Sequence, residues 1–285
     1  MLALMNLRGQ DEAFLPEEVA SLRAAAIWLL DLQNRDGGWP TFCRGWGTLP
    51  FDRSSCDLTA HALRALDLWL QRVSGTDTAL KMRTERSMRR GIRFLQNVQR
   101  PDGTWLPLWF GHQFNEDDEN PLYGTSRVIR ALATIGEESS DCCQKAVRWI
   151  LDNQNDDGGW SARRGLESSV EETGLALDSL ASLKRGANIA AGTSQRVPDT
   201  TGSAHTTGSP PALSNALDRA AQWLAVRVNA DTVDRPTPIG FYFARLWYFE
   251  DLYPIIFAAA GLNGWRNIAP QFDAPPANQP KSAAK

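Results

Sequence analysis

Several residue types and patterns that would point to a common function class are scarce in this 285-residue sequence. Cysteine occurs four times and histidine three times, and the cysteine spacing fits no zinc-finger pattern. The formal net charge is −3, without a long basic run, so no nucleic-acid partner is expected. No apolar run reaches the roughly 20 residues of a membrane-spanning helix. The longest candidate, Leu252–Leu262, is interrupted by Pro254 and Gly261.

The first residues also lack the pattern of a secretory signal. Met1–Arg8 is short and is followed by polar residues without a cleavage pattern. Cys142 and Cys143 are adjacent, and neighbouring cysteines rarely pair with each other. We therefore read all four cysteines as reduced thiols and expect a cytoplasmic protein, with peripheral contact to a membrane surface left open.

What the sequence does contain is eleven tryptophans and a repeat that uses them. Segments 28–39, 94–105 and 149–160 each hold an aromatic–aliphatic pair, a glutamine at a fixed distance and the tetrapeptide Asp-Gly-x-Trp. A decayed fourth copy starts at Trp223. The repeated glutamines and tryptophans are Gln33, Trp39, Gln99, Trp105, Gln154 and Trp160.

A staple between helices explains this motif physically. The aromatic–aliphatic pair lies near the end of an amphipathic helix, and the glycine after aspartate favours a turn that stops the helix. The tryptophan then folds back on the helix end, and the glutamine bonds backbone groups there. We interpret the motif as structural.

A second repeat lies between the staples. Asp57, Tyr123 and Glu171 align, each two residues before a threonine, and each opens an Ala- and Leu-rich helix with few charges. The helices before the staples carry more charge. Alternating inner and outer helices predict an all-α fold, an α/α toroid (an incomplete α/α barrel) of about four helix pairs.

The domain boundaries follow from composition. We expect an N-terminal segment at 1–17, the toroid at 18–268 and a disordered, Pro- and Ala-rich tail at 269–285. Residues 186–211, rich in Gly, Ser, Thr, Ala and Pro, predict a mobile insertion within the toroid.

These motifs resemble those of the squalene–hopene and oxidosqualene cyclases. The staple is similar to the QW motif of that family, Asp57-Leu58-Thr59-Ala60-His61 to its Asp-x-Thr-Ala-His segment, and Leu122-Tyr123-Gly124-Thr125 to its Leu-Tyr-Gly-Thr. The stretch from Phe241 to Pro254 resembles its aromatic C-terminal helix. The resemblance implies cyclisation of an apolar, squalene-like C30 isoprenoid through carbocations, started by an aspartic acid and without a cofactor.

The protonating residue of that family is not found here. It belongs to an Asp-x-Asp-Asp motif, which lies before the first staple and which this sequence lacks. The family barrel also closes with six helix pairs. We therefore expect the C-terminal portion of a cyclase, inactive alone, which pairs with an upstream-encoded N-terminal half or associates with itself.

The resemblance assigns candidate site residues. His61 would bond the catalytic acid and raise its acidity, Asp57 would support this network, and Tyr123 would help to manage the proton. Glu171 occupies the same repeat position as Tyr123 and is a candidate residue of the substrate cavity, where an acid or base role is the alternative to a helix cap. The structural alternatives are a helix cap for Asp57 and Glu171 and a buried, satisfied side chain for His61 and Tyr123.

Aromatic residues are the candidates for the substrate cavity, because aromatic faces stabilise cations. Trp109 matches a cavity aromatic of the family by its position after the staple. Trp247, Tyr248 and Phe249 are expected in a last inner helix that spans Arg245–Leu262. An ordinary aromatic core remains the alternative.

Two other function classes stay open. A prenyltransferase β-subunit would need a zinc site, yet Cys56 and His61 have no third ligand at suitable spacing. A non-catalytic toroid would bind an apolar isoprenoid or a partner chain. The acidic run Glu116–Glu119 could hold magnesium, but Asn120 and Pro121 favour a solvated loop, so no metal is expected.

Overall fold

The computed structural model describes residues 1–7, 12–41, 52–73, 75, 77–193, 211–241 and 246–268. Its elements are α1 (Leu2–Leu7), α2 (Pro16–Leu32), α3 (Cys56–Arg72), α4 (Thr78–Val98), α5 (Pro121–Thr134), α6 (Asp141–Asp152), α7 (Val170–Thr193), α8 (Pro211–Asn229), β1 (Ile239–Phe241), β2 (Leu246–Tyr248) and α9 (Leu252–Arg266). The described chain is therefore helical apart from one short hairpin, as the sequence predicted.

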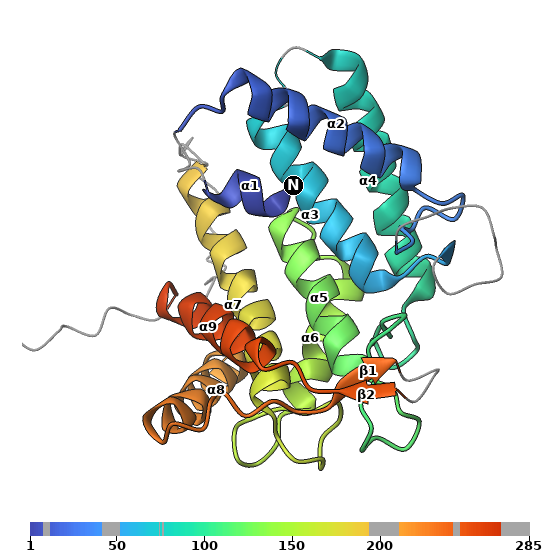
Figure 1. Cartoon of the computed structure of the whole chain (residues 1–285). Coiled ribbons are helices and arrows are strands. Elements are labelled where there is room, and N and C mark those ends of the chain that lie inside the picture. Colours follow the sequence, from blue (N-terminus) through green and yellow to red (C-terminus); the bar gives the residue numbers. More distant parts are fainter. Residues whose placement is uncertain are drawn as a thin grey trace, which may run out of the picture.

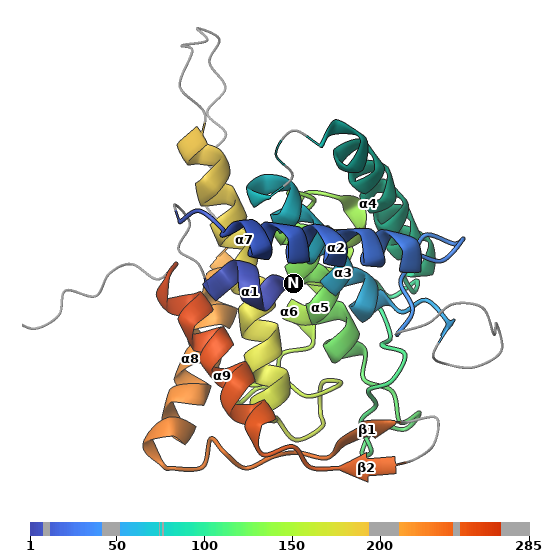
Figure 2. The same cartoon turned by 45° about the horizontal axis from the view of Figure 1, so that its top comes forward.

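The helices form two layers. The inner helices α3, α5, α7 and α9 pack against one another in that order, and α4, α6 and α8 each pack against the inner helix that precedes them in the chain (Figures 1 and 2). Helix α2 packs against α3 and α4. The alternation of inner and outer helices is that of an α/α toroid, here an arc of inner helices from α3 to α9.

Burial follows the charge pattern of the sequence. In α5 the charged side chains are two arginines, and most of its remaining residues are buried, Ile129 and Leu132 completely. Outer helix α6 instead buries one stripe, Cys142, Cys143, Ala146, Val147 and Ile150, at the spacing of an amphipathic helix. Helices with few charged residues thus form the inner layer, and the more highly charged helices form the outer layer that covers them.

The staples repeat atom by atom. Each staple tryptophan is at most 1% exposed, and its indole Nε1 donates to the carbonyl ten residues earlier, at 2.8 Å in Trp39, Trp105 and Trp160. Its backbone N–H donates to the threonine hydroxyl of the next inner helix, at 2.9–3.0 Å. The acceptors are Leu29, Leu95 and Ile150 for the indoles and Thr59, Thr125 and Thr173 for the backbone.

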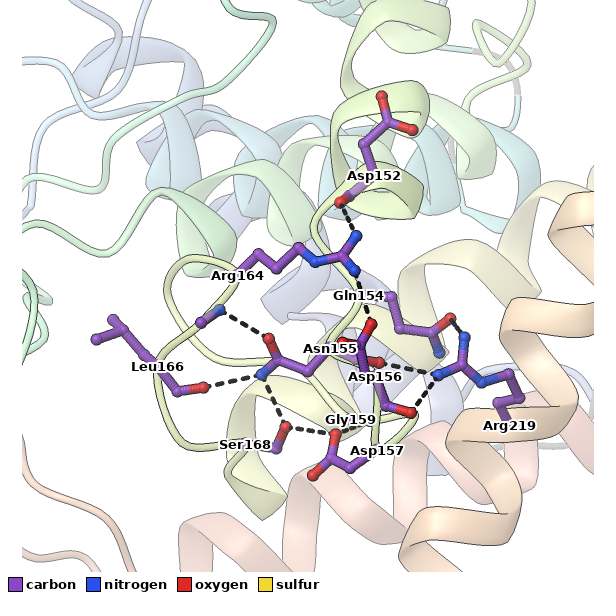
Figure 3. Close-up of polar contacts among 11 residues, drawn as sticks. Asp152, Gln154, Asn155, Asp156, Asp157, Gly159, Arg164, Leu166, Ser168 and Arg219 are labelled. Carbon is purple, nitrogen blue, oxygen red and sulfur yellow. Dashed lines mark hydrogen bonds and ion pairs between the residues drawn. The ribbon is translucent and has the colours of Figure 1, made fainter.

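The glutamine of each staple joins two repeats. Gln154 Nε2 donates to the carbonyls of Gly158 at 2.8 Å and of Ala216, in the following outer helix, at 3.0 Å. Arg219 on that helix returns bonds to the carbonyls of Asn155 and Asp156, so the third staple is held from both sides (Figure 3). The staple is therefore the device that fixes successive helix pairs to one another.

Helices α7 and α9 pack through glycine. A Cβ at Gly174 would lie 2.4 Å from the carbonyl carbon of Phe257, and one at Gly261 would lie 2.7 Å from the carbonyl oxygen of Gly174. The absence of side chains at these two positions lets the backbones approach closely and brings Phe257 to the inner face.

Two sequence expectations need correction. Arg245–Leu262 is not one helix: Trp247 and Tyr248 lie in strand β2, with Ile239 opposite Tyr248, and α9 begins only at Leu252. Pro254 explains the late start, because proline is tolerated in the first turn of a helix and not further inside. Helix α7 runs on to Thr193, so the expected insertion is helical over 186–193. Residues 194–210 and the expected tail, 269–285, lie outside the described residues.

The N-terminal segment contributes to the core. Helix α1 packs against α3, Met5 is fully buried, and the guanidinium of Arg72 donates to the carbonyl of Met5. A short helix outside the expected repeat therefore covers the C-terminal half of α3.

Candidate functional site on the inner helices

Three inner helices carry matching positions on one face, and all of these residues except Leu175 are polar. The spacing i, i+4, i+7 places residues on the same side of a helix. In α3 these positions hold Asp57, His61 and Arg64; in α5, Tyr123, Arg127 and Arg130; in α7, Glu171, Leu175 and Asp178. The interactions described below connect these positions across the helices, so they form one site.

Asp57 opens the site at the N-terminus of α3. It is buried, and its carboxylate accepts a close hydrogen bond from the Ser55 hydroxyl. Burial raises the pKa of Asp57, and the Ser55 bond and the positive charge of Arg127 act in the opposite direction. Asp57 is thus a carboxyl whose protonation responds to its neighbours.

His61 lies one turn further along α3. Burial lowers its pKa to about 4, and the charges of Arg127 and Arg64 add to this effect, so the imidazole is neutral near pH 7. The positive charge that a neighbouring acid would feel therefore comes from Arg127 rather than from His61.

His61 also forms part of the wall of a cavity of about 350 Å³ between α1, α2 and α3. The other wall residues are almost all apolar: Met1, Leu2, Ala25, Trp28, Leu29, Leu32, Trp39, Pro40, Thr41, Leu58, Ala62 and Ala65. This cavity lies on the side of α3 where the series of inner helices begins, and it could hold an apolar group next to the imidazole.

Arg127 is the centre of the site. Its guanidinium carbon lies 5.0 Å from the ring centroid of Tyr123 and 5.0 Å from that of Phe257, so the cation sits between two aromatic faces. Arg127 influences the pKa values of Asp57, His61 and Tyr123. The structure thus brings the three predicted network residues together around an arginine.

Tyr123 is buried, and burial raises the pKa of its phenol. The ring of Phe110 packs against it with the centroids 4.7 Å apart. Tyr253 and Phe257 of α9 pack together on the same side, 5.3 Å between centroids, and belong to one apolar cluster with Tyr123. Tyr253 and Phe257 of α9 thus supply aromatic surface beside Tyr123, and burial together with Tyr253 raises the pKa of Tyr248 in β2.

The aromatic residues expected in the cavity lie in a loop and around strand β2 rather than in an inner helix. Trp247 and Tyr248 are half-buried in β2, and Phe249, which follows it, is 61% exposed. Trp109 is half-buried in the loop before α5, where its indole N–H donates to the Thr41 hydroxyl at 2.7 Å.

The loop that contains Trp109 covers the N-terminus of α3. The backbone N–H of Leu108 donates to the Ser55 hydroxyl at 3.1 Å, and the Cys56 thiol donates to the Leu106 carbonyl. The hairpin joins this cover through a bond from the Gly111 N–H to the Gly240 carbonyl. Asp57 is therefore closed off from the side of the loops.

Glu171 and Glu172 open α7, and both are buried. Glu171 accepts a bond from the Thr237 N–H at 2.8 Å, and Glu172 accepts one from the Asn120 side chain at 3.0 Å. The second oxygen of each carboxyl is buried without a hydrogen bond, and burial raises the pKa of both to about 7. This placement makes Glu171 part of a buried acid pair rather than a simple exposed helix cap.

The third matching position holds an arginine in both α3 and α5, namely Arg64 and Arg130. Arg130 makes a close ion pair with Asp178 of α7, and burial together with Arg130 and Arg127 lowers the pKa of Arg64 to about 10. The side-chain Nε atoms of Arg64 and Arg127 are buried and have no hydrogen-bond partner among the described residues.

The two metal sites considered from the sequence were a zinc site that includes Cys56 and His61 and a magnesium site at Glu116–Glu119. Within the described ranges, no three His, Cys, Asp or Glu side chains gather as metal ligands. Burial raises the pKa of the Cys56 thiol, which donates a hydrogen bond to the Leu106 carbonyl. In the acidic run, Glu119 pairs with Arg100 at 2.7 Å, while Glu116 is exposed.

Sequence reasoning missed Arg64, Arg127 and Arg130. The signal was present, because they stand four and seven residues after the aligned positions Asp57 and Tyr123. Isolated arginines usually lie at the surface. That these three lie on the inner faces of α3 and α5 becomes visible only when the two helices are aligned at Asp57 and Tyr123.

Comparisons with known proteins agree with the fold. The model of the squalene-hopene cyclase C-terminal domain family matches residues 2–105 and 47–202. Enfumafungin synthase from Hormonema carpetanum is 28% identical over 243 residues, 77% of this chain and 16% of that protein. Copalyl diphosphate synthase from Streptomyces cyslabdanicus is 35% identical over 130 residues, 45% of this chain and 22% of that protein.

A solved structure has the same arrangement of helices. The ent-copalyl diphosphate synthase from Streptomyces platensis superimposes with a TM-score of 0.57 at 20% identity, covering 84% of this chain and 37% of that one. The chain spans only about a sixth to a fifth of the length of the two curated relatives named above. None of the described helices combines the length and apolarity that a bilayer crossing requires.

Proposed function

Because this chain belongs to the squalene-hopene cyclase C-terminal domain family, we propose that it is the C-terminal part of a cyclase that closes rings in an isoprenoid by a proton-initiated carbocation cascade. The proposal covers its role within the larger enzyme. The described residues contribute one wall of a reaction cavity and the groups that tune an acid supplied from elsewhere.

The observation that carries the proposal is the packing of α3, with Asp57 and His61, against α5, where Arg127 lies 5.0 Å from the Tyr123 ring centroid. A positive charge beside a carboxylic acid favours its ionised form and strengthens it as a proton donor. Arg127 supplies this charge, and the neutral imidazole of His61 can accept or donate one hydrogen bond. The rings of Tyr123 and Phe257 lie against the Arg127 guanidinium and hold this charge in place.

The acid itself is proposed to come from an inner helix that precedes α3. The apolar cavity beside His61 lies on that side of α3, with Trp28 at its wall 54% exposed. A helix docked there would place an aspartic acid next to the imidazole and cover the tryptophan. The sequence holds no Asp-x-Asp-Asp motif of its own.

The first experiment incubates the purified chain with squalene and with a C20 isoprenoid diphosphate, followed by gas chromatography with mass spectrometry. We expect no cyclic product from the chain alone, since proton transfer from a positioned acid starts the cascade. Cyclic product from this chain alone would overturn the proposed division of roles.

The second experiment reconstitutes activity with the upstream-encoded part of the enzyme. His61→Ala in this chain should then lower the rate roughly 10²-fold or more, the usual contribution of a positioned acid–base group. His112→Asn is the matched control, because burial lowers the pKa of His112 to about 4, as it does for His61, whereas His112 contacts Ser161 outside the site. Equal losses in the two variants would show a structural effect.

A non-catalytic role makes a different prediction. A binding toroid would take up an isoprenoid in the cavity beside His61 without the upstream part. Isothermal titration with squalene in detergent-solubilised form separates the two functions: saturable binding by the chain, with no turnover after reconstitution, would favour the binding protein.

A further inference from the structure

We propose that the face of α2 formed by Ser21, Ala24, Ala25 and Trp28 is a docking face for a staple turn of the Gln-x-x-Asp-Gly-x-Trp type from another polypeptide. The inference deepens the proposed function and rests on it for the identity of that polypeptide, the upstream part of the enzyme. The docking face itself is inferred from the three joints at which the staples of this chain contact α4, α6 and α8.

The joint between the third staple and α8 shows what such a turn contacts. Gln154 donates to the carbonyl of Ala216 at 3.0 Å, and the indole N–H of Trp223 donates to the Asp157 carboxylate at 2.8 Å. A Cβ at Gly159 would lie 2.8 Å from the Trp223 ring, so the ring packs directly on this glycine. One aromatic residue of the outer helix thus covers the turn and is buried by it.

The same positions recur on each outer helix that follows a staple. Seven residues before its aromatic residue, a backbone carbonyl accepts from the staple glutamine at 2.8–3.0 Å. These acceptors belong to Ser87, Cys142 and Ala216. Three residues before the aromatic residue stands a small one, in turn Gly91, Ala146 and Ala220. A Cβ at Gly91 would lie 2.8 Å from the Trp39 ring, so a small residue here leaves room for the staple tryptophan.

Helix α2 carries the same positions, but they are open. Counted from Trp28, the acceptor carbonyl is that of Ser21 and the small residue is Ala25. Trp28 is 54% exposed and Ser21 is exposed, whereas Phe94 and Trp223 at the aromatic position of α4 and α8 are 6% and 5% exposed. Ala25 lines the cavity of about 350 Å³ described above, so there is space beside the position at which a staple tryptophan packs.

The polypeptide that occupies this face must bring its own staple. The sequence contains the Gln-x-x-Asp-Gly-x-Trp pattern three times, and these glutamines are already bonded to α4, α6 and α8. A second copy of the chain would therefore have to open one of its own joints. A helix that ends in such a turn and lies outside this sequence fits the face without that cost, and it is what the upstream part would supply.

One contact of the joints is missing on α2, and it allows a gain-of-function test. Arg90 of α4 and Arg219 of α8 stand four residues before the aromatic residue, and each donates to two carbonyls of the staple turn (Figure 3 shows Arg219). Helix α2 has the exposed Ala24 at this place. Ala24→Arg should therefore strengthen the binding of a staple turn, because it adds charge-assisted hydrogen bonds. Misfolding of the variant would not produce such a gain.

The probe is a synthetic peptide of residues 140–169, which holds α6 and the third staple. It suits α2 because its own partner α8 also has a tryptophan at the aromatic position. A lactam between the side chains introduced by Gln144→Glu and Arg148→Lys, both exposed on α6, keeps the helix formed in the free peptide. A second peptide with Gln154→Ala and Trp160→Ala is the matched control.

Isothermal titration of the full chain with the first peptide tests the docking face. Trp28→Ala removes the ring that covers the turn, and Ala25→Leu fills the space that the staple tryptophan needs. We expect saturable binding that each of these variants weakens at least about tenfold and that Ala24→Arg strengthens about threefold or more. Met82→Ala, at a 57% exposed position of α4, is the control variant and should bind as the wild-type chain does.

The proposal is overturned if the wild-type chain does not bind the first peptide, or binds the second equally well. Equal binding by Trp28→Ala and Met82→Ala, or no gain from Ala24→Arg, would place the peptide elsewhere and reject the docking face. The reconstituted cyclisation test remains separate. Peptide binding without turnover would keep the docking face and reject the cyclase role, and turnover without peptide binding would do the reverse.

Discussion

At the scale of single residues, the burial of the staple tryptophans predicts how much each contributes to the free energy of unfolding. Trp39, Trp105 and Trp160 are almost completely buried, and each indole N–H is bonded to a helix carbonyl. Replacement of any one by alanine should lower the free energy of unfolding by about 3–5 kcal/mol, the usual cost for a large buried aromatic side chain.

Trp265 is the matched control in urea melts. Its ring is only half-buried and its indole bonds Asp218 at the surface, so Trp265→Ala should cost clearly less. Equal losses at all four tryptophans would contradict the special role of the staple.

The buried pair Glu171 and Glu172 predicts a pH dependence. Their folded-state pKa values are about 7, against 4.5 for an ordinary glutamate, so the folded chain retains protons that the unfolded chain releases between about pH 4.5 and pH 7. The contribution of these groups to stability is therefore present below this window and is lost as the pH rises through it.

The double variant Glu171→Gln/Glu172→Gln isolates this effect from the histidines, whose lowered pKa values act in the opposite direction. Going from pH 5 to pH 8, the wild-type chain should lose at least about 1 kcal/mol of stability relative to the variant, because one pKa unit corresponds to about 1.4 kcal/mol. A constant difference between the two melts at both pH values would reject the buried acid pair.

At the scale of elements, the docking of α9 depends on Gly174. A methyl group there would meet the Phe257 backbone at 2.4 Å, and backbone cannot move aside as a flexible side chain can. Gly174→Ala should therefore loosen α9 from α7, lower stability by about 1–3 kcal/mol and speed amide exchange over Leu252–Arg266. Ala260→Ser, on the exposed face of α9, is the control; unchanged exchange in Gly174→Ala would argue against this packing.

The same scale shows what the sequence could predict. Asp-Gly-x-Trp with glutamine at a fixed distance is a local pattern, and it predicted where α2, α4 and α6 end. The region from Phe241 to Phe249 is apolar without a clear period, so the sequence alone does not distinguish a strand from a helix there. The expected helix over Arg245–Leu262 followed the family resemblance and did not take into account that Pro254 favours a helix start only a few residues before it. The placement of the arginines depends on the register between α3, α5 and α7, which no single segment encodes.

At the scale of the whole molecule, Leu66 and Phe257 of the inner helices are buried, whereas other large apolar side chains are exposed. The large exposed apolar residues instead include Trp28 on α2 and Leu252, Ile255 and Ile256 on α9, near the two ends of the helix series.

Such ends need a cover, because helical repeat stacks depend on polar caps for solubility. We therefore expect that the purified chain alone self-associates at micromolar concentration or requires detergent, since each covered Leu or Ile side chain contributes about 1.5–3 kcal/mol. Leu252→Glu/Ile256→Glu should shift the chain towards a monomer in size-exclusion chromatography with light scattering. Met82→Glu, at an exposed position of α4, is the control and should change nothing. A detergent-independent wild-type monomer with a cooperative melt would mean that α1 and the hairpin already close the helix series, and the need for a partner at these ends would be withdrawn.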